Sequence, residues 1–119
     1  MWKIVYNLLT LCALPVFLVI GLTNAKIKKN FRHRLVPRVQ GPTFTGACMI
    51  HGASIGEAII AGSIADHLAR NGGPGRFLFT TNTSYAQEML ERKEGGKEGR
   101  QVAPLPFDLR FSVARFLNY

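Results

Sequence analysis

The feature that most constrains this chain is a mostly apolar run near its amino terminus, from Ile4 to Leu22, in which Asn7 and Thr10 are the most polar residues. The run contains no charged residue. Nineteen helical residues at about 1.5 Å each extend about 28 Å, close to the ~30 Å hydrocarbon core of a bilayer. Pro15 lies in its middle, where a membrane helix tolerates proline better than a water-soluble helix does. Residues 1–25 are therefore predicted to form a membrane anchor helix.

Basic residues follow this run directly. Residues 1–56 contain seven Lys or Arg and no acidic residue, whereas residues 57–119 contain eight basic and seven acidic residues. Six of the first seven lie after the apolar run, so the positive-inside rule keeps the following part of the chain in the cytoplasm. A signal peptide cleaved near residues 23–25 and a buried helix of a soluble fold are the alternatives.

The basic juxtamembrane segment, residues 26–42, has two interpretations. It can simply fix the topology, or it can hold anionic lipid headgroups at ~1 kcal/mol per basic residue. Nucleic acid is not an expected partner, because only Phe31 interleaves the basic side chains. The predicted lipid and phosphate contacts are Lys28, Lys29, Arg32 and Arg34.

Residues 43–119 alternate between strand and helix patterns. The predicted strands are Thr45–Ile50, Arg76–Thr81 and Gln101–Leu105, and the predicted helices are Ile55–Asn71, Ser84–Glu94 and Asp108–Leu117. This alternation predicts an α/β fold with a parallel sheet and helices on its faces. Three strand–helix units are too few for a complete doubly wound domain, so we expect part of a Rossmann-like domain.

The turn between the first strand and the first helix, residues 51–57, is the candidate site, because ligands of parallel sheets bind beyond the carboxyl ends of the strands. The spacing from Gly52 to Gly56 fits neither the dinucleotide fingerprint nor the P-loop. Glu57 fits two roles. With Ser54 it matches the S-x-x-E capping box, and as a carboxylate at the ligand-facing edge it could take a proton from a substrate hydroxyl.

Other polar residues at this edge also have two interpretations. His51 fits a hydrogen-bonded strand end or a catalytic group, and Thr83 and Ser84 fit an N-cap of the second helix or a ligand contact. Neither Cys12 nor Cys48 has a partner at metal-ligand spacing. No cluster of metal-ligating residues appears in the sequence, so we expect no metal site, and we also expect no cofactor.

The segment Met49–Glu57 resembles the (W/I)-H-(A/G)-x-S-(V/I)-G-E signature of the 3-deoxy-D-manno-octulosonic acid (Kdo) transferases of lipopolysaccharide biosynthesis. The apolar anchor and basic segment, the threonine-rich strand end Phe79–Thr83, and the stretch Pro104–Leu117 also resemble that family. One departure is Ala86, which stands where the family's T-x-T-x-T-G stretch has its glycine.

The resemblance implies an inverting glycosyltransferase of the GT-B type, with two Rossmann-like domains, of which residues 43–119 form an incomplete acceptor-side domain. It implies transfer of Kdo from CMP-Kdo to a lipid A precursor, with Glu57 as the general base. The implied acceptor-binding residues are His51, Gly52, Ala53, Ser54, Gly56, Thr81 and Thr83.

The resemblance further implies a single-pass protein of the inner (cytoplasmic) membrane whose donor-binding domain lies outside these 119 residues. The isolated chain is therefore expected to be inactive. Two alternatives stay open, namely another membrane-associated GT-B enzyme that uses a UDP-sugar, and a non-catalytic module at the membrane surface.

Overall fold

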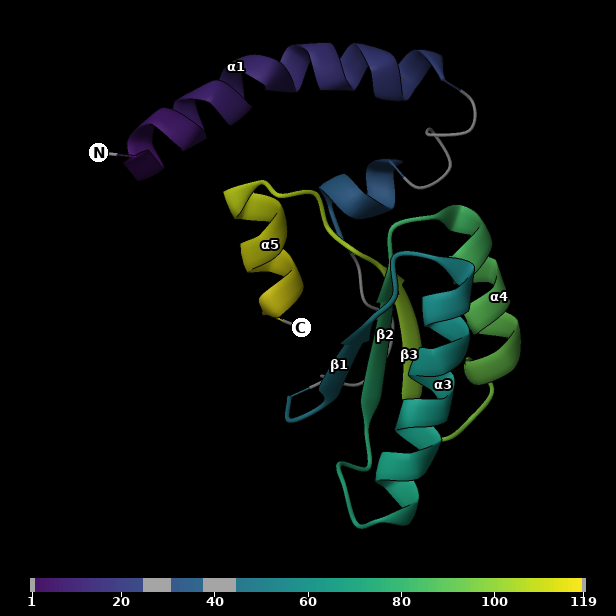
Figure 1. Ribbon diagram of the computed structural model, residues 1–119. Helices are drawn as coiled ribbons and strands as arrows, with labels where there is room; N and C mark the ends of the chain where they lie inside the picture. Colours follow the sequence, from purple (N-terminus) through teal and green to yellow (C-terminus); the bar gives the residue numbers. More distant parts are fainter. Residues whose placement is uncertain (1, 25–30, 38–44, 119) are drawn as a thin grey trace. The chain divides into compact units, whose positions relative to one another are not determined.

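The computed structural model describes residues 2–24, 31–37 and 45–118 (Figure 1). Its elements are α1 (Trp2–Thr23), β1 (Cys48–His51), α3 (Ile55–Arg70), β2 (Phe77–Thr81), α4 (Ser84–Glu94), β3 (Arg100–Pro104) and α5 (Arg110–Leu117). Contacts divide them into two compact units. One unit holds residues 1–38 and 106–118, and the other holds residues 39–105. The C-terminal helix α5 thus groups with the N-terminal elements.

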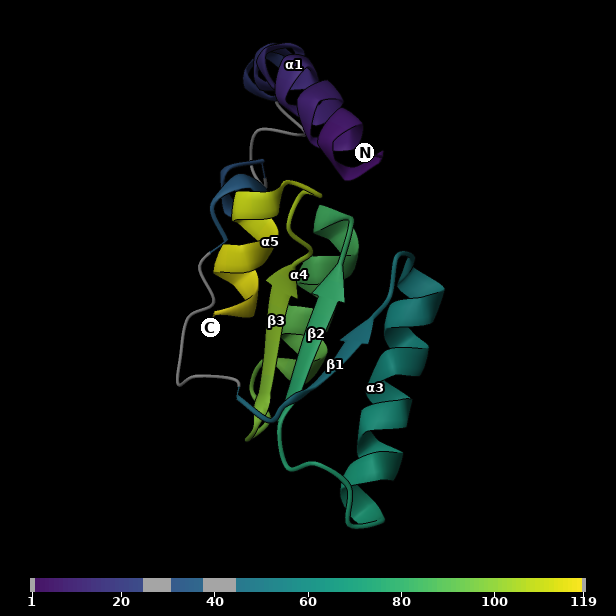
Figure 2. The same cartoon turned by 90° about the vertical axis from the view of Figure 1, so that its left-hand side faces the viewer.

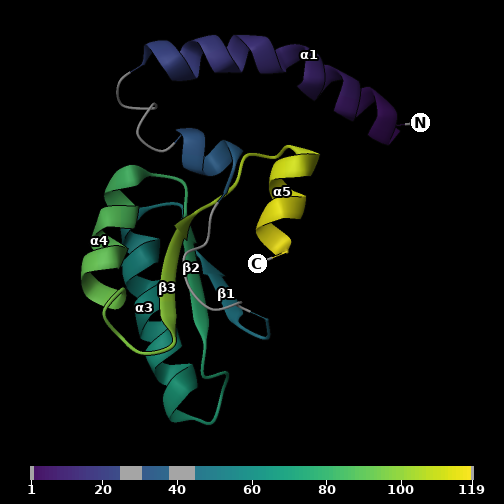
Figure 3. The same ribbon diagram turned by 180° about the vertical axis from the view of Figure 1, so that it is seen from behind.

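The second unit is a three-stranded parallel sheet in the order β1-β2-β3, which confirms the predicted α/β class. Cys48 pairs with Phe77, and Phe77 in turn pairs with Arg100. All three strands point the same way, so the β1–α3 and β2–α4 turns lie at the same end of the sheet (Figure 2). Helices α3 and α4 pack side by side against the sheet (Figure 3).

The core of this unit lies between the sheet and these two helices. Its members are Phe77 and Phe79 of β2, Ala58, Ala61 and Ala65 of α3, and Ala86 and Leu90 of α4. The row of alanines lets the backbone of α3 approach the phenylalanine rings closely. Burial of each phenylalanine contributes roughly 1.5–3 kcal/mol. Along β1, Cys48 and Ile50 pack against this core, and the alternate residues Met49 and His51 are exposed.

Helix α3 ends where the sequence predicts. Asn71 is its C-cap, and Gly72 follows with φ +74°, in the left-handed region that favours glycine. The Gly73 amide then donates to the Leu68 carbonyl at 2.9 Å. The predicted start of the first strand at Thr45 is wrong, because residues 45–46 form a turn in which Gly46 has φ +78°. Pairing with β2 begins at Cys48.

The first unit combines α1, a short helical segment at 31–35, and α5. The centroids of the Phe31 and Phe107 rings lie 5.1 Å apart. The Ser112 hydroxyl donates a hydrogen bond of 2.6 Å to the Arg34 carbonyl oxygen. Helix α1 is long and apolar enough to cross a membrane. Most of its large apolar side chains are exposed, with Trp2 and Leu8 as examples.

Candidate functional site

The candidate site lies at the end of the sheet where β1 and β2 give way to helices. The Gly52 amide donates to the Thr80 carbonyl at 3.0 Å and extends the pairing of the strands by one residue. The turns at residues 52–54 and 82–83 therefore leave the sheet next to each other. This arrangement brings together the predicted acceptor-binding residues of both turns, as parallel pairing requires.

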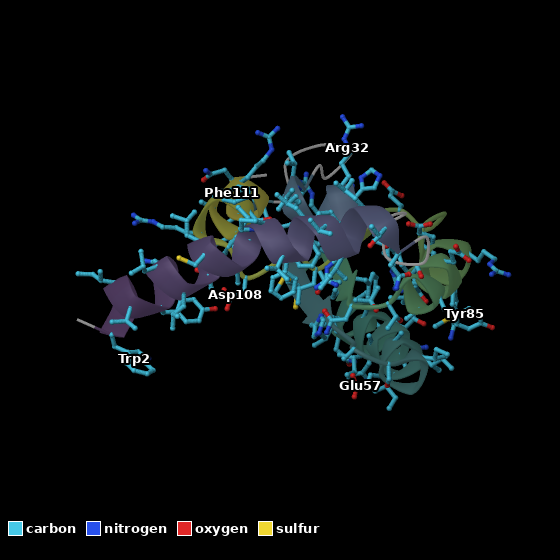
Figure 4. The ribbon with its side chains drawn as sticks, turned by 90° about the horizontal axis from the view of Figure 1, so that it is seen from above. Trp2, Arg32, Glu57, Tyr85, Asp108 and Phe111 are labelled. Atoms are coloured by element: carbon cyan, nitrogen blue, oxygen red, sulfur yellow. The ribbon has the colours of Figure 1, made fainter. Side chains whose placement is uncertain are left out.

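Glu57 closes the first of these turns. Its backbone amide donates to Ser54 Oγ at 3.3 Å, and its Oε2 accepts from the amides of Ala53 at 2.7 Å and Ser54 at 3.3 Å. The predicted capping box is thus present at the start of α3. Because both of the amides that bond to the carboxylate use Oε2, the carboxylate is held in place, and Oε1 has no hydrogen-bond partner among the described residues. The side chain is exposed and lies beside α3 (Figure 4), with its carboxylate turned back to the amides of residues 53 and 54.

The two glycines of the turn differ in what surrounds them. A Cβ added at Gly52 would lie 2.9 Å from the backbone nitrogen of Ala58, so a larger residue would push the turn away from α3. At Gly56, an added Cβ would have no heavy atom of the described residues within 4 Å, apart from the adjoining backbone of α3. Gly52 therefore serves the packing of the turn, whereas the space beside Gly56 is open to an approaching molecule.

The second turn is organised by two threonines. Thr81 is buried, and its Oγ1 accepts from the Thr83 amide at 3.4 Å. Thr83 is the N-cap of α4, with its Oγ1 accepting from the Ala86 amide at 3.3 Å. The N-cap interpretation of Thr83 is therefore confirmed. Contact of either threonine with a ligand stays a prediction, and buried Thr81 would act by shaping the turn.

The basic segment is described only in part, since Lys28 and Lys29 lie outside the described residues. Arg32 is exposed and extends away from the ribbon (Figure 4). Arg34 is half-buried, with its guanidinium carbon 4.4 Å from the centroid of the Phe107 ring, and burial lowers the pKa of Arg34 below its ordinary value. An arginine stays charged at neutral pH despite such a change, so Arg34 contributes both charge and packing.

An ion-pair cluster lies where β3 begins, and sequence patterns do not reveal it. Arg100 pairs with the carboxylates of Glu94 and Asp66, and Lys97 Nζ lies 3.0 Å from Glu94 Oε2. The hydrogen bond from Arg100 holds the pKa of Asp66 below its ordinary value. The Glu94 side chain is fully buried, and its Oε1 has no hydrogen-bond partner in the part of the chain that the structure describes. The one sequence hint is Gly62 inside α3, where an added Cβ would lie 2.7 Å from that oxygen.

No group of three or more His, Cys, Asp or Glu side chains in residues 2–24, 31–37 and 45–118 could hold a metal ion. The described site offers a fixed carboxylate, an imidazole and backbone amides. A carboxylate positioned in this way can accept a proton from a hydroxyl group. Backbone amides at a helix N-terminus favour negative charge nearby.

The chain that contains this turn is similar to known proteins. Residues 24–119 match the family described as 3-Deoxy-D-manno-octulosonic-acid transferase (kdotransferase). A curated protein of Haemophilus influenzae, named 3-deoxy-D-manno-octulosonic acid transferase, is 32% identical over 126 residues. That match covers 100% of this chain and 29% of the relative, so the chain spans less than a third of the relative's length.

No solved structure matches this chain. The family match nevertheless contains both turns of the candidate site, together with the strands and helices that position them. The resemblance drawn from residues 49–57 is confirmed. The chain belongs to the Kdo transferase family and corresponds to its N-terminal part.

Proposed function

We propose that this chain is the acceptor-side part of an inverting GT-B glycosyltransferase that moves Kdo from CMP-Kdo to a lipid A precursor. The observation that carries the proposal is the position of Glu57. Two backbone amides hold its Oε2 at the ligand-facing edge of a parallel sheet, and Oε1 is left for a substrate. Membership of the Kdo transferase family supports the choice of sugar.

In the proposed reaction, Glu57 Oε1 takes the proton from a hydroxyl group of the acceptor. The acceptor oxygen attacks the anomeric carbon of Kdo from the face opposite CMP, the bond to CMP breaks, and the configuration inverts. Base catalysis by a positioned carboxylate typically contributes ~10²–10⁴-fold to the rate. The donor is bound by a second Rossmann-like domain, so residues 1–119 alone do not complete the reaction. The open space beside Gly56 lets the acceptor approach the turn.

The same proposal places α1 in the inner membrane with the α/β unit in the cytoplasm. The exposed apolar side chains of α1 support this, because a water-soluble protein rarely exposes so large an apolar patch. The basic residues that follow α1 support the cytoplasmic orientation. An anchored enzyme meets its lipid acceptor at the bilayer surface and does not have to extract it.

Insertion of α1 across a bilayer has a consequence for the first unit. The Tyr6 hydroxyl donates to the Asp108 carboxylate, and one face of α1 lines an apolar groove of about 440 Å³ with Phe31, Leu35 and Phe107. Tyr6 precedes the end of α1 by 17 residues, or about 25 Å of helix. A spanning helix carries it to the opposite membrane surface, so the Tyr6–Asp108 bond breaks on insertion and lipid chains replace the groove contacts.

The direct test uses the complete enzyme in nanodiscs with a lipid A precursor and either CMP-Kdo or a UDP-hexose. We expect transfer from CMP-Kdo only, measured as the mass gain of the lipid by one or more Kdo units. Transfer from the UDP-hexose instead would show another membrane-associated glycosyltransferase. No transfer from either donor, with the protein folded, would favour the non-catalytic module.

The basic segment gives a second expectation. Replacing Lys28, Lys29, Arg32 and Arg34 together by Gln is expected to weaken binding to vesicles that contain the phosphorylated acceptor more than binding to neutral vesicles. The reason is that each basic side chain contributes ~1 kcal/mol only where anionic groups are present. Vesicle co-sedimentation measures both affinities. An equal loss on both kinds of vesicle would mean that the four residues do not recognise the acceptor's phosphates.

A further inference from the structure

His51 and Thr80 face each other at the end of the sheet where the candidate site lies. They are register partners on the adjacent strands β1 and β2, and His51 Nδ1 lies 3.1 Å from Thr80 Oγ1. The two residues differ in exposure, since the histidine is exposed and the threonine is fully buried. His51 therefore has one ring nitrogen fixed by the fold, which leaves Nε2 as the nitrogen available to a ligand.

The direction of this hydrogen bond follows from the burial of Thr80. A hydroxyl group has one hydrogen to donate and can also accept, whereas a neutral imidazole donates from one nitrogen and accepts at the other. Among the described residues, Thr80 Oγ1 bonds only to His51 Nδ1. If Nδ1 carried the proton, the buried hydroxyl hydrogen would have no acceptor, and a buried donor without a partner is unfavourable. The hydroxyl therefore donates to Nδ1.

We propose that Thr80 is a positioning residue, whose buried hydroxyl donates to Nδ1 of His51 and sets the tautomer of the neutral imidazole, with its hydrogen on Nε2. Residue His51 then presents a hydrogen-bond donor at the ligand-facing edge, and it does not act as a base there. This assigns the proton-accepting role to Glu57 alone. It also assigns to Thr80 a function that differs from that of its neighbour Thr81, whose Oγ1 shapes the second turn.

The chemistry of the ligand follows from the donor. An N–H group at Nε2 binds an oxygen atom of the acceptor, either a sugar hydroxyl in its role as an acceptor of hydrogen bonds or a phosphate oxygen. This ligand assignment rests on the proposed function, whereas the protonation of His51 does not. The two can therefore fail separately in the experiment.

Nitrogen NMR of the complete enzyme in nanodiscs tests the protonation directly. The ¹⁵N shifts and two-bond ¹⁵N–¹H couplings of histidine distinguish the two neutral tautomers, and the spectrum is recorded near pH 8.5, about two units above the ordinary histidine pKa of ~6.5. A His51→Gln variant identifies the His51 signals by their absence from its spectrum. We expect a single tautomer protonated at Nε2, with the unprotonated Nδ1 shifted by an accepted hydrogen bond.

Variants at position 80 supply the control. Thr80→Val removes the hydroxyl at nearly constant volume and is expected to move the His51 signals toward the mixture of tautomers found in free histidine, whereas Thr80→Ser is expected to preserve the wild-type spectrum. Thr81→Val is expected to leave the His51 signals unchanged. A hydrogen on Nδ1 in the wild-type chain, or identical His51 signals in wild type and Thr80→Val, would overturn the proposal.

Activity of the complete enzyme tests the ligand assignment. Thr80→Val is expected to lower kcat/KM for the acceptor about tenfold, which corresponds to ~1.4 kcal/mol, and Thr80→Ser to restore it. The KM for CMP-Kdo should not change. Unaltered kcat/KM in Thr80→Val, with its tautomer mixture observed, would overturn the donor role of His51 toward the acceptor. Absence of transfer in the wild type would instead count against the proposed function and leave the tautomer result standing.

Discussion

Replacing Glu57 by Gln in the complete enzyme is expected to lower kcat for Kdo transfer by ~10²–10⁴-fold while the unfolding temperature stays the same. Glutamine keeps the carbonyl oxygen that accepts from the Ala53 and Ser54 amides, and the capping box accepts Gln at this position. The amide cannot take a proton from the acceptor hydroxyl. The change therefore separates the two roles of one side chain, and a loss in kcat with the acceptor KM nearly constant indicates an interaction made in the transition state.

Ser54→Ala is the matched variant. It removes the hydrogen bond from the Glu57 amide to Ser54 Oγ and leaves the carboxylate in place. Loss of such an N-cap costs ~0.5–2 kcal/mol, so its unfolding temperature should fall where that of Glu57→Gln does not. Thermal unfolding and a transfer assay with saturating CMP-Kdo measure both properties. Normal transfer by Glu57→Gln would mean that Glu57 only caps α3 and that the catalytic proposal is wrong.

The parallel sheet and its helices could be predicted from the sequence because their signals are local. The apolar spacing of α3 and its Asn71-Gly72-Gly73 ending specify the helix within the segment itself, and the structure has the same boundaries to within one residue. The capping box of Ser54 and Glu57 is local in the same sense, since its two residues are three apart. Local patterns of this kind predict the structure correctly when no residue distant in the sequence bonds to the same backbone or side-chain groups.

Boundaries set by distant partners could not be predicted. Asp108 is a typical residue for a helix start, and the sequence places the last helix from Asp108 onward. In the structure α5 begins only at Arg110, with Leu109 as an N-cap that makes no side-chain bond, and the Ser112 hydroxyl of α5 donates to the Arg34 carbonyl. This contact joins residues 78 positions apart, which no local pattern can show.

The ion-pair cluster of Arg100 escaped prediction for the same reason, since its partners lie on different elements. Asp66 lies on α3, Glu94 ends α4, and Arg100 begins β3. A helix interior usually prefers Ala to Gly by up to about 1 kcal/mol, so Gly62 in α3 looks unfavourable when read alone. The position of the Glu94 carboxylate explains why glycine stands at residue 62, because the methyl group of an alanine there would collide with Glu94 Oε1.

This cluster carries the largest expected effect on stability. Glu94→Ala is expected to lower the free energy of unfolding of the α/β unit by ~3–5 kcal/mol, because it leaves the Arg100 guanidinium without its buried partner. The Glu94 side chain is fully buried and the Arg100 side chain is 8% exposed, so water replaces little of the lost interaction. Hydrogen exchange at the amides of β2 measures the effect in this unit alone, whatever the stability of the rest of the enzyme.

Two further variants distinguish the pair from a general loss of packing. Lys97 contacts the same carboxylate but is 42% exposed, and Lys97→Ala is expected to cost less than ~1 kcal/mol. The double change Glu94→Leu with Arg100→Met replaces the buried pair by apolar side chains and is expected to recover most of the stability that Glu94→Ala loses, since such replacements are often neutral. If the double variant is as unstable as Glu94→Ala, the charges themselves hold α4 and β3 together. A loss below ~1 kcal/mol in Glu94→Ala would show instead that the unbonded Oε1 offsets what the ion pair contributes.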